Sequence, residues 1–142
     1  MINVESLIQI AAMERSSDIH LICGLPPKGR IDGRLVSLTE TPLTHDDCEE
    51  MAKFLAGDRY PEMERIGEID AAMSIGGERI RINLFRQQGH VSAALRILSN
   101  RIPKLGDLGL PPVVAKFPTY QKGIVLVTGE TGSGKSTSLA AL

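Results

Sequence analysis

The chain has 142 residues, of which 42% are hydrophobic and 23% are charged, and its formal net charge is −1. The length predicts one domain, or one domain with part of a second, and the composition is that of an ordinary globular protein. The balanced charge gives no indication of a nucleic-acid partner or an acidic membrane surface, and we find neither a signal peptide nor an apolar stretch long enough to span a membrane.

The cysteines and histidines indicate no metal centre. Cys23 and Cys48 are far apart in the sequence and match no metal-binding spacing. We favour free thiols in a reducing compartment over a disulfide between them. The three histidines, His20, His45 and His90, form no ligand cluster with the cysteines.

The first third of the chain predicts a helix followed by strands. Apolar residues at helical spacing begin the chain; they are Val4, Leu7, Ile8, Ala11 and Ala12. Residues 16–38 alternate in polarity and are broken by glycine and proline, which predicts three short strands. The last two of these strands are joined by a turn at Asp32-Gly33.

The middle of the chain predicts a second helix and three further strands. Thr44 and Asp47 have the spacing of a capping box. Behind them, an apolar helical face ends near Gly57; it consists of Cys48, Met51, Ala52 and Leu55. A short helix over 62–66 follows, and residues 67–98 have the pattern of three strands.

The last third predicts the start of another domain. Residues 99–110 resemble a linker, and a short helix over 113–117 follows Pro111-Pro112. Residues 123–128 form a β-branched apolar run that is typical of a buried parallel strand, and a helix begins near Ser136. The sequence therefore predicts an α/β domain over 1–98, a linker over 99–110 and an incomplete domain over 111–142.

A phosphate-binding loop lies between the last predicted strand and helix. Gly129, Gly134, Lys135 and Ser136 match the spacing G-x-x-x-x-G-K-[ST], in the required strand–loop–helix context. Lys135 would reach the β- and γ-phosphates of ATP, and the Ser136 hydroxyl would help to hold Mg²⁺. The alternative is a glycine-rich turn that leads into a helix. The complete set of predicted nucleotide contacts is Gly129, Thr131, Gly132, Ser133, Gly134, Lys135, Ser136 and Thr137.

The hairpin in residues 78–98 places two arginines opposite each other. A two-residue turn at Gln88-Gly89 pairs three sets of apolar residues on one face and sets Arg81 against Arg96 on the other. Facing like charges are destabilising unless an anion neutralises them, so the pair is a candidate functional feature. The alternative is that both side chains extend into water at little cost. Arg79 is expected to be solvated, and Arg86 to cap the rim of the sheet.

Several segments together resemble the type II/type IV secretion ATPase superfamily, and in particular its pilus retraction motors. The specific segments are Ser-Asp-Ile-His-Leu at 17–21, Arg-x-Asn-x-Phe-Arg-Gln at 81–87 and the loop region 123–139. The resemblance implies a PAS-like N-terminal domain with a mostly antiparallel sheet, followed by the first strand, phosphate loop and helix of a RecA-like ATPase domain. It also implies that Arg81, Arg96 and Lys135 act on ATP with Mg²⁺. Glu130 departs from the family loop, which commonly has proline there.

The resemblance further implies a cytoplasmic homo-hexamer at the inner face of the membrane, working with a pilus platform protein. The family's acidic box, Walker B strand and histidine box should follow residue 142, so we expect an N-terminal piece of a longer ATPase that is inactive alone. Two alternatives remain open. One is a pilus-extension or type II secretion ATPase, and the other is a PAS-like interaction module without its own nucleotide chemistry.

Overall fold

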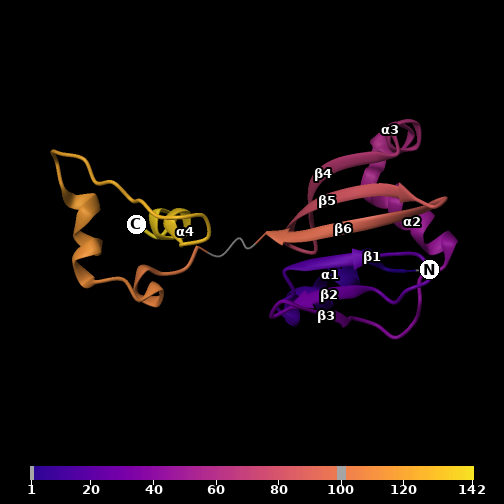
Figure 1. The fold of residues 1–142 in the computed structure, drawn as a ribbon, viewed down its shortest axis with the longest axis horizontal. Coiled ribbons are helices and arrows are strands. Elements are labelled where there is room, and N and C mark those ends of the chain that lie inside the picture. Colours follow the sequence, from indigo (N-terminus) through magenta and orange to yellow (C-terminus); the bar gives the residue numbers. More distant parts are fainter. Residues whose placement is uncertain (1, 99–101) are drawn as a thin grey trace. The chain divides into compact units, whose positions relative to one another are not determined.

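The chain divides into two units between residues 99 and 100 (Figure 1). The computed structural model describes residues 2–98 and 102–142. The predicted linker begins at this division, and its residues 99–101 lie outside the described residues. Within the rest of that linker the chain forms a short 3-10 helix, η2 (Leu105–Leu108), so the segment is less irregular than the sequence predicts.

The first unit is built on a six-stranded sheet with the order β3-β2-β1-β6-β5-β4, in which neighbouring strands are antiparallel. This confirms the predicted three-plus-three strands. The strands are β1 (Asp18–Leu21), β2 (Lys28–Ile31), β3 (Arg34–Ser37), β4 (Glu68–Ile75), β5 (Glu78–Gln87) and β6 (His90–Leu98).

Two of the hairpins turn on residue pairs in the left-handed region. Asp32 and Gly33 have φ values of 48° and 78°, and Gln88 and Gly89 have φ values of 52° and 81°. Two consecutive positive φ angles match the right-handed twist of the flanking strands. Both turns therefore lie where the sequence predicts them.

Two helices of this unit begin at residues whose side chains cap them. In α1 (Val4–Met13) the Asn3 side chain accepts a hydrogen bond from the Ser6 N–H. In α2 (His45–Ala56) Thr44 and Asp47 form the predicted capping box, and Gly57 ends the helix. A 3-10 turn, η1 (Gly57–Arg59), leads into α3 (Tyr60–Ile66). These caps satisfy backbone groups that have no partner within the helix.

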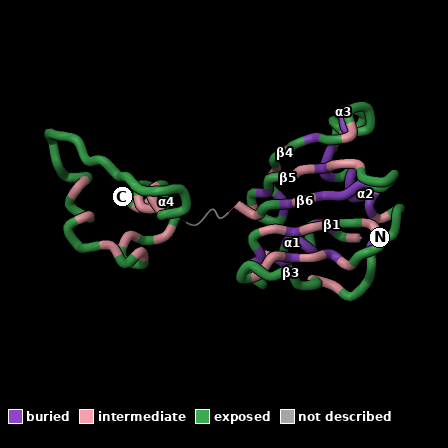
Figure 2. The backbone as a smooth tube through the Cα atoms, in the orientation of Figure 1, coloured by how far each residue is buried: buried purple, intermediate pink, exposed green. Residues whose placement is uncertain are grey.

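The core lies between one face of the sheet and the helices, as the buried positions in Figure 2 indicate. Alternate residues of β5 and β6, such as Ile82, Leu84 and Leu95, are almost fully buried beside the apolar face of α2. Each such side chain contributes about 1.5–3 kcal/mol relative to an exposed position. The opposite face of the sheet is left to polar side chains, including both candidate arginines.

The second unit contains η2, a 3-10 helix η3 (Pro112–Thr119) and α4 (Lys135–Ala140). None of its described residues, 102–142, is buried. The predicted strand over 123–128 is wrong for this chain: residues 124–129 have no regular secondary structure, and the Ile124 and Leu126 side chains are 83% and 78% exposed. A strand requires a neighbouring strand for its backbone groups, and no described segment pairs with this one.

Candidate nucleotide-binding site

The glycine-rich segment before α4 adopts a compact loop that depends on its glycines. Gly129, Gly132 and Gly134 have φ values of 153°, 84° and 91°, which side chains rarely allow. A Cβ atom at Gly129 would lie 2.7 Å from the Ser133 hydroxyl, so the backbone there approaches the other side of the loop closely. The Ser133 hydroxyl itself donates to the Glu130 carbonyl at 2.7 Å. The loop therefore has the tight backbone that phosphate cradles use.

Lys135 folds back over this loop. Its ammonium group donates to the carbonyl oxygens of Gly129 at 2.7 Å and Glu130 at 2.6 Å. The cation is thus held beside the backbone that would surround a phosphate. Both carbonyls are neutral acceptors, so a phosphate oxygen would replace them with a stronger hydrogen bond in which both partners are charged.

The remaining predicted contacts are exposed or half-buried at the start of α4. Ser136 and Thr137 are exposed in the first turn, where the hydroxyl of Ser136 is accessible to a metal ion bound with ATP. The residues present therefore fit Mg-nucleotide, with the backbone and Lys135 for the phosphates and Ser136 for the ion.

The arginine pair lies where the predicted register places it. Across β5 and β6, Arg81 faces Arg96, Ile82 faces Leu95 and Leu84 faces Ala93. Both arginines are exposed, on the face opposite the buried Ile82 and Leu95. This confirms the register, while the role of the two arginines stays a prediction.

Asp18 supplies an anion that the hairpin pattern alone could not predict. It is directly opposite Arg96 on the neighbouring strand β1, and its Oδ1 accepts from the Arg96 Nε at 3.0 Å. Partial burial alone would raise the pKa of Asp18, but hydrogen bonds from Ser17 and Arg96 outweigh it, so this pKa lies below its usual value. Arg81 makes no ion pair with any described residue, so the two arginines differ in their freedom to bind an external anion.

A shallow hollow beside the arginines carries further polar groups. The Asn83 amide donates to Glu68 at 2.9 Å and to Asp70 at 3.2 Å. The hollow is lined by Asp18, Asp70, Arg81, Ile82, Asn83, Ala94, Leu95 and Arg96. Arg79, on the same face, is exposed as predicted.

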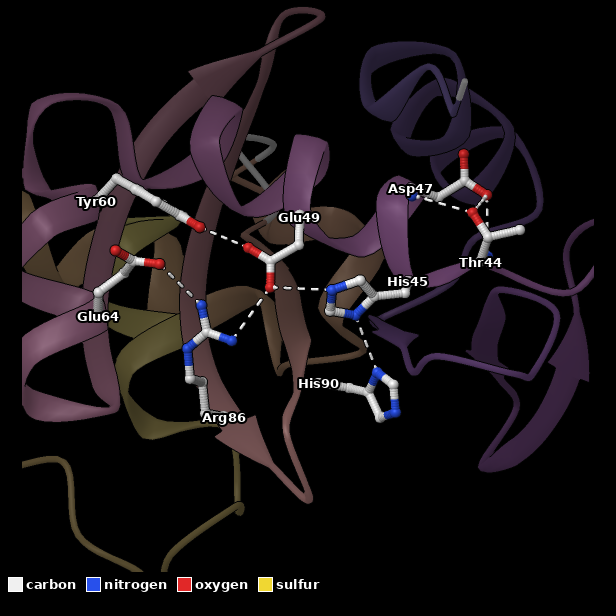
Figure 3. Close-up of polar contacts among 8 residues, drawn as sticks. All are labelled: Thr44, His45, Asp47, Glu49, Tyr60, Glu64, Arg86 and His90. Atoms are coloured by element: carbon white, nitrogen blue, oxygen red, sulfur yellow. Dashed lines mark hydrogen bonds and ion pairs between the residues drawn. The ribbon is translucent and has the colours of Figure 1, made fainter.

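Arg86 is more deeply involved in the structure than the sequence suggests. Its guanidinium group bridges Glu49 of α2 and Glu64 of α3, at 3.1 Å each (Figure 3). The Tyr60 hydroxyl donates to the other Glu49 oxygen at 2.5 Å. Burial raises the pKa of Tyr60, and the hydrogen bond to Glu49 raises it further, so Tyr60 stays a donor. This network ties both helices to β5, a role that sequence spacing cannot reveal.

The histidines also depart from what their spacing suggests. His45, at the start of α2, and His90, at the start of β6, face each other with their Nδ1 atoms 3.0 Å apart (Figure 3). Residues 45 positions apart give no local pattern that could have predicted this contact.

The chain is similar to known proteins over almost its whole length. No protein-family model matches it. It is 36% identical to the uncharacterised protein YggR of Escherichia coli (strain K12) and 33% identical to the type IV pilus retraction ATPase PilT of Pseudomonas aeruginosa PAO1. Each alignment includes 99% of this chain, and 43% and 41% of the relatives. A crystal structure of the pilus retraction motor PilT with bound ADP matches with a TM-score of 0.81 and 39% identity, over 99% of this chain and 42% of that one.

Over almost its whole length the chain is PilT-like, in sequence and in structure. It spans about two fifths of the length of the relatives that it matches. The predicted mixed α/β architecture is confirmed both by the antiparallel sheet and by the likeness to the PilT structure. Among the described residues of this PilT-like chain, no helix is both long and apolar enough to cross a membrane.

Proposed function

We propose that this chain is the N-terminal part of an ATPase motor that drives pilus retraction. The phosphate loop around Lys135 carries this proposal, because its glycine angles and its folded-back lysine suit a phosphate ligand. The likeness to a PilT structure with bound ADP supports it. In this proposal ATP binds with Mg²⁺, the enzyme is a cytoplasmic hexamer at the inner membrane face, and a pilus platform protein is its partner.

Each residue has a defined role in this proposal. The backbone of 129–134 and the Lys135 ammonium would bind the β- and γ-phosphates, the Ser136 hydroxyl would help to hold Mg²⁺, and Thr137 would contact the nucleotide. When bound, the ion would supply positive charge for the transferred phosphoryl group. Domains 1–98 and 111–142 are a PAS-like domain and the start of a RecA-like domain.

Arg81 and Arg96 add positive charge from the N-terminal domain. Arg81 has no ion-pair partner among the described residues, so it can bind phosphate directly. Arg96 must first exchange the Asp18 carboxylate, 3.0 Å away, for a phosphate oxygen.

The test measures phosphate release from ATP by a longer form of this protein that matches its relatives in length. Lys135→Ala should lower turnover by about 10²–10³-fold or more, because it removes positive charge from the site of transfer. Lys122→Ala is the matched control, since it removes an exposed lysine outside the loop and should leave turnover unchanged. Normal turnover in Lys135→Ala would show that the loop assignment is wrong. The 142-residue chain alone should show no turnover.

A second function is a pilus-extension or secretion role for the same motor. Type II secretion system protein E of Pseudomonas aeruginosa is 32% identical to this chain in an alignment that includes 97% of it, and this similarity supports the secretion role. A deletion strain would separate the two: loss of twitching with surplus pili indicates retraction, and loss of pili or of secretion indicates the alternative.

A further inference from the structure

The contact between His45 and His90 joins the start of α2 to the start of β6. The two Nδ1 atoms are 3.0 Å apart, and the ring planes meet at 71° with centroids 5.1 Å apart. Both residues are exposed, so a solute reaches both nitrogens. A hydrogen bond between two Nδ1 atoms requires one ring to donate and the other to accept.

A carboxylate lies near the other nitrogen of the His45 ring. Its Oε1 lies 4.0 Å from the Nε2 atom of His45, one helical turn along α2 (Figure 3). A carboxylate on that side favours the proton on Nε2 and leaves the Nδ1 lone pair of His45 directed at His90. Carboxylates occupy this position behind many metal-binding histidines, where they set the tautomer and increase ligand basicity.

The spacing of the two nitrogens suits one metal ion. Two nitrogens that are 3.0 Å apart, each about 2.1 Å from a shared ion, subtend an angle of about 90° at that ion. This is the angle between neighbouring ligands in square-planar and octahedral complexes, which Cu²⁺ and Ni²⁺ prefer. A tetrahedral Zn²⁺ site would require the nitrogens to be about 3.4 Å apart.

The charges around the pair are mixed. The first turns of α2 carry four acidic residues, which favour a cation, whereas Arg86 binds Glu49 at 3.1 Å and opposes it. The acidic residues are Asp46, Asp47, Glu49 and Glu50. Residues 2–98 and 102–142 hold no group of three or more metal-ligating side chains, so water must complete the coordination.

We infer that His45 and His90 form a two-histidine site for a Ni²⁺- or Cu²⁺-class ion, with Glu49 orienting His45 from behind. The ion would take both Nδ1 lone pairs, and the Nδ1 proton of His90 would be replaced by one on its exposed Nε2 side through solvent. Such an ion joins the start of α2 to the tip of the β5–β6 hairpin, the same hairpin that carries both arginines. This site is independent of the nucleotide chemistry proposed above.

The test is calorimetric titration of the tag-free 142-residue chain with NiCl₂. We expect one Ni²⁺ per chain, and at least about tenfold weaker binding in His45→Gln and in His90→Gln, because each removes one of two protein ligands. Glu49→Gln should weaken binding by about tenfold, at the low end of the effect of outer-shell partners. Zn²⁺ should bind more weakly than Ni²⁺.

The matched control is His20→Gln. His20 is the third histidine, and its Nε2 atom is buried, so it should not contribute to binding. The Cys48 thiol is a poor competitor, because burial raises its pKa to about 12. Ni²⁺ should also broaden the NMR signals of the His45 and His90 rings before those of His20. Absence of binding by the wild-type chain, or unchanged binding in His90→Gln, would overturn the inference.

Discussion

The two units of this chain differ most in what holds their elements in place. In the first unit, strands, turns and caps all meet at a core of buried aliphatic side chains. In the second, the loop that carries the nucleotide motif is held by local hydrogen bonds, and none of residues 102–142 is buried (Figure 2). The comparison shows that a phosphate loop can take its compact conformation from glycines and short-range hydrogen bonds, whereas its preceding strand cannot form without a neighbour.

We expect the largest difference in stability between the two units from a pair of leucine truncations. Leu84→Ala removes a fully buried side chain and should lower the free energy of unfolding by about 2–5 kcal/mol, measured by urea denaturation. Leu126→Ala removes a side chain that is 78% exposed and should change it by less than about 0.5 kcal/mol. Similar losses in both variants would contradict the contrast.

A pair of glycine substitutions should give a smaller difference in the same direction. A Cβ atom at Gly29 would lie 2.8 Å from both Leu38 Cδ2 and Ser16 Oγ, so Gly29→Ala should cost about 1–3 kcal/mol. At Gly106 the same Cβ meets nothing within 4 Å, and Gly106→Ala should be close to neutral. The unfolding midpoints of the two variants check this, and an equally destabilising Gly106→Ala would show that the second unit is more tightly packed than described.

The smallest effect concerns Asp18 and acid. Because the pKa of Asp18 is lowered on folding, its contribution is fully present above the ordinary carboxyl pKa of about 3.9 and is lost as the pH falls through the lowered value. Arg96 is 66% exposed, so we expect about 0.2–1 kcal/mol from the pair. Asp18→Asn should therefore be less stable than the wild type at pH 7 and should approach it near pH 2. A difference that stays constant between these pH values would exclude the titration of Asp18 as its cause.

Local patterns in the sequence account for most of the first unit. The Gln88-Gly89 turn and the apolar alternation together define the β5–β6 register, because a slip of one residue would move every side chain to the other face. Local patterns of this kind do not predict the order of strands in the sheet when those strands are distant in sequence. The Asp18–Arg96 pair depends on β1 lying beside β6, which no spacing within either strand indicates.

One wrong prediction and one unpredicted contact have the same origin. Residues 123–128 have the composition of a buried strand, but composition does not supply the partner strand that burial requires. His45 and His90 give no signal in the sequence, because their contact is made by the packing of α2 against the hairpin. The phosphate loop is predictable from sequence, because the glycine spacing, Lys135 and the following helix are all local.

The central proposal is that Lys135, Arg81 and Arg96 all contribute to ATP turnover. The most direct measurement is the ATP turnover of the full-length protein with Arg81→Ala or Arg96→Ala, together with its melting temperature. We predict turnover lower by roughly 10²-fold with folding intact, and the larger loss for Arg81, which is not paired with Asp18. Arg79→Ala, an exposed arginine on the same face, should keep the wild-type rate. Wild-type rates in both Arg81→Ala and Arg96→Ala, with a slightly raised melting temperature from relieved repulsion, would contradict the claim.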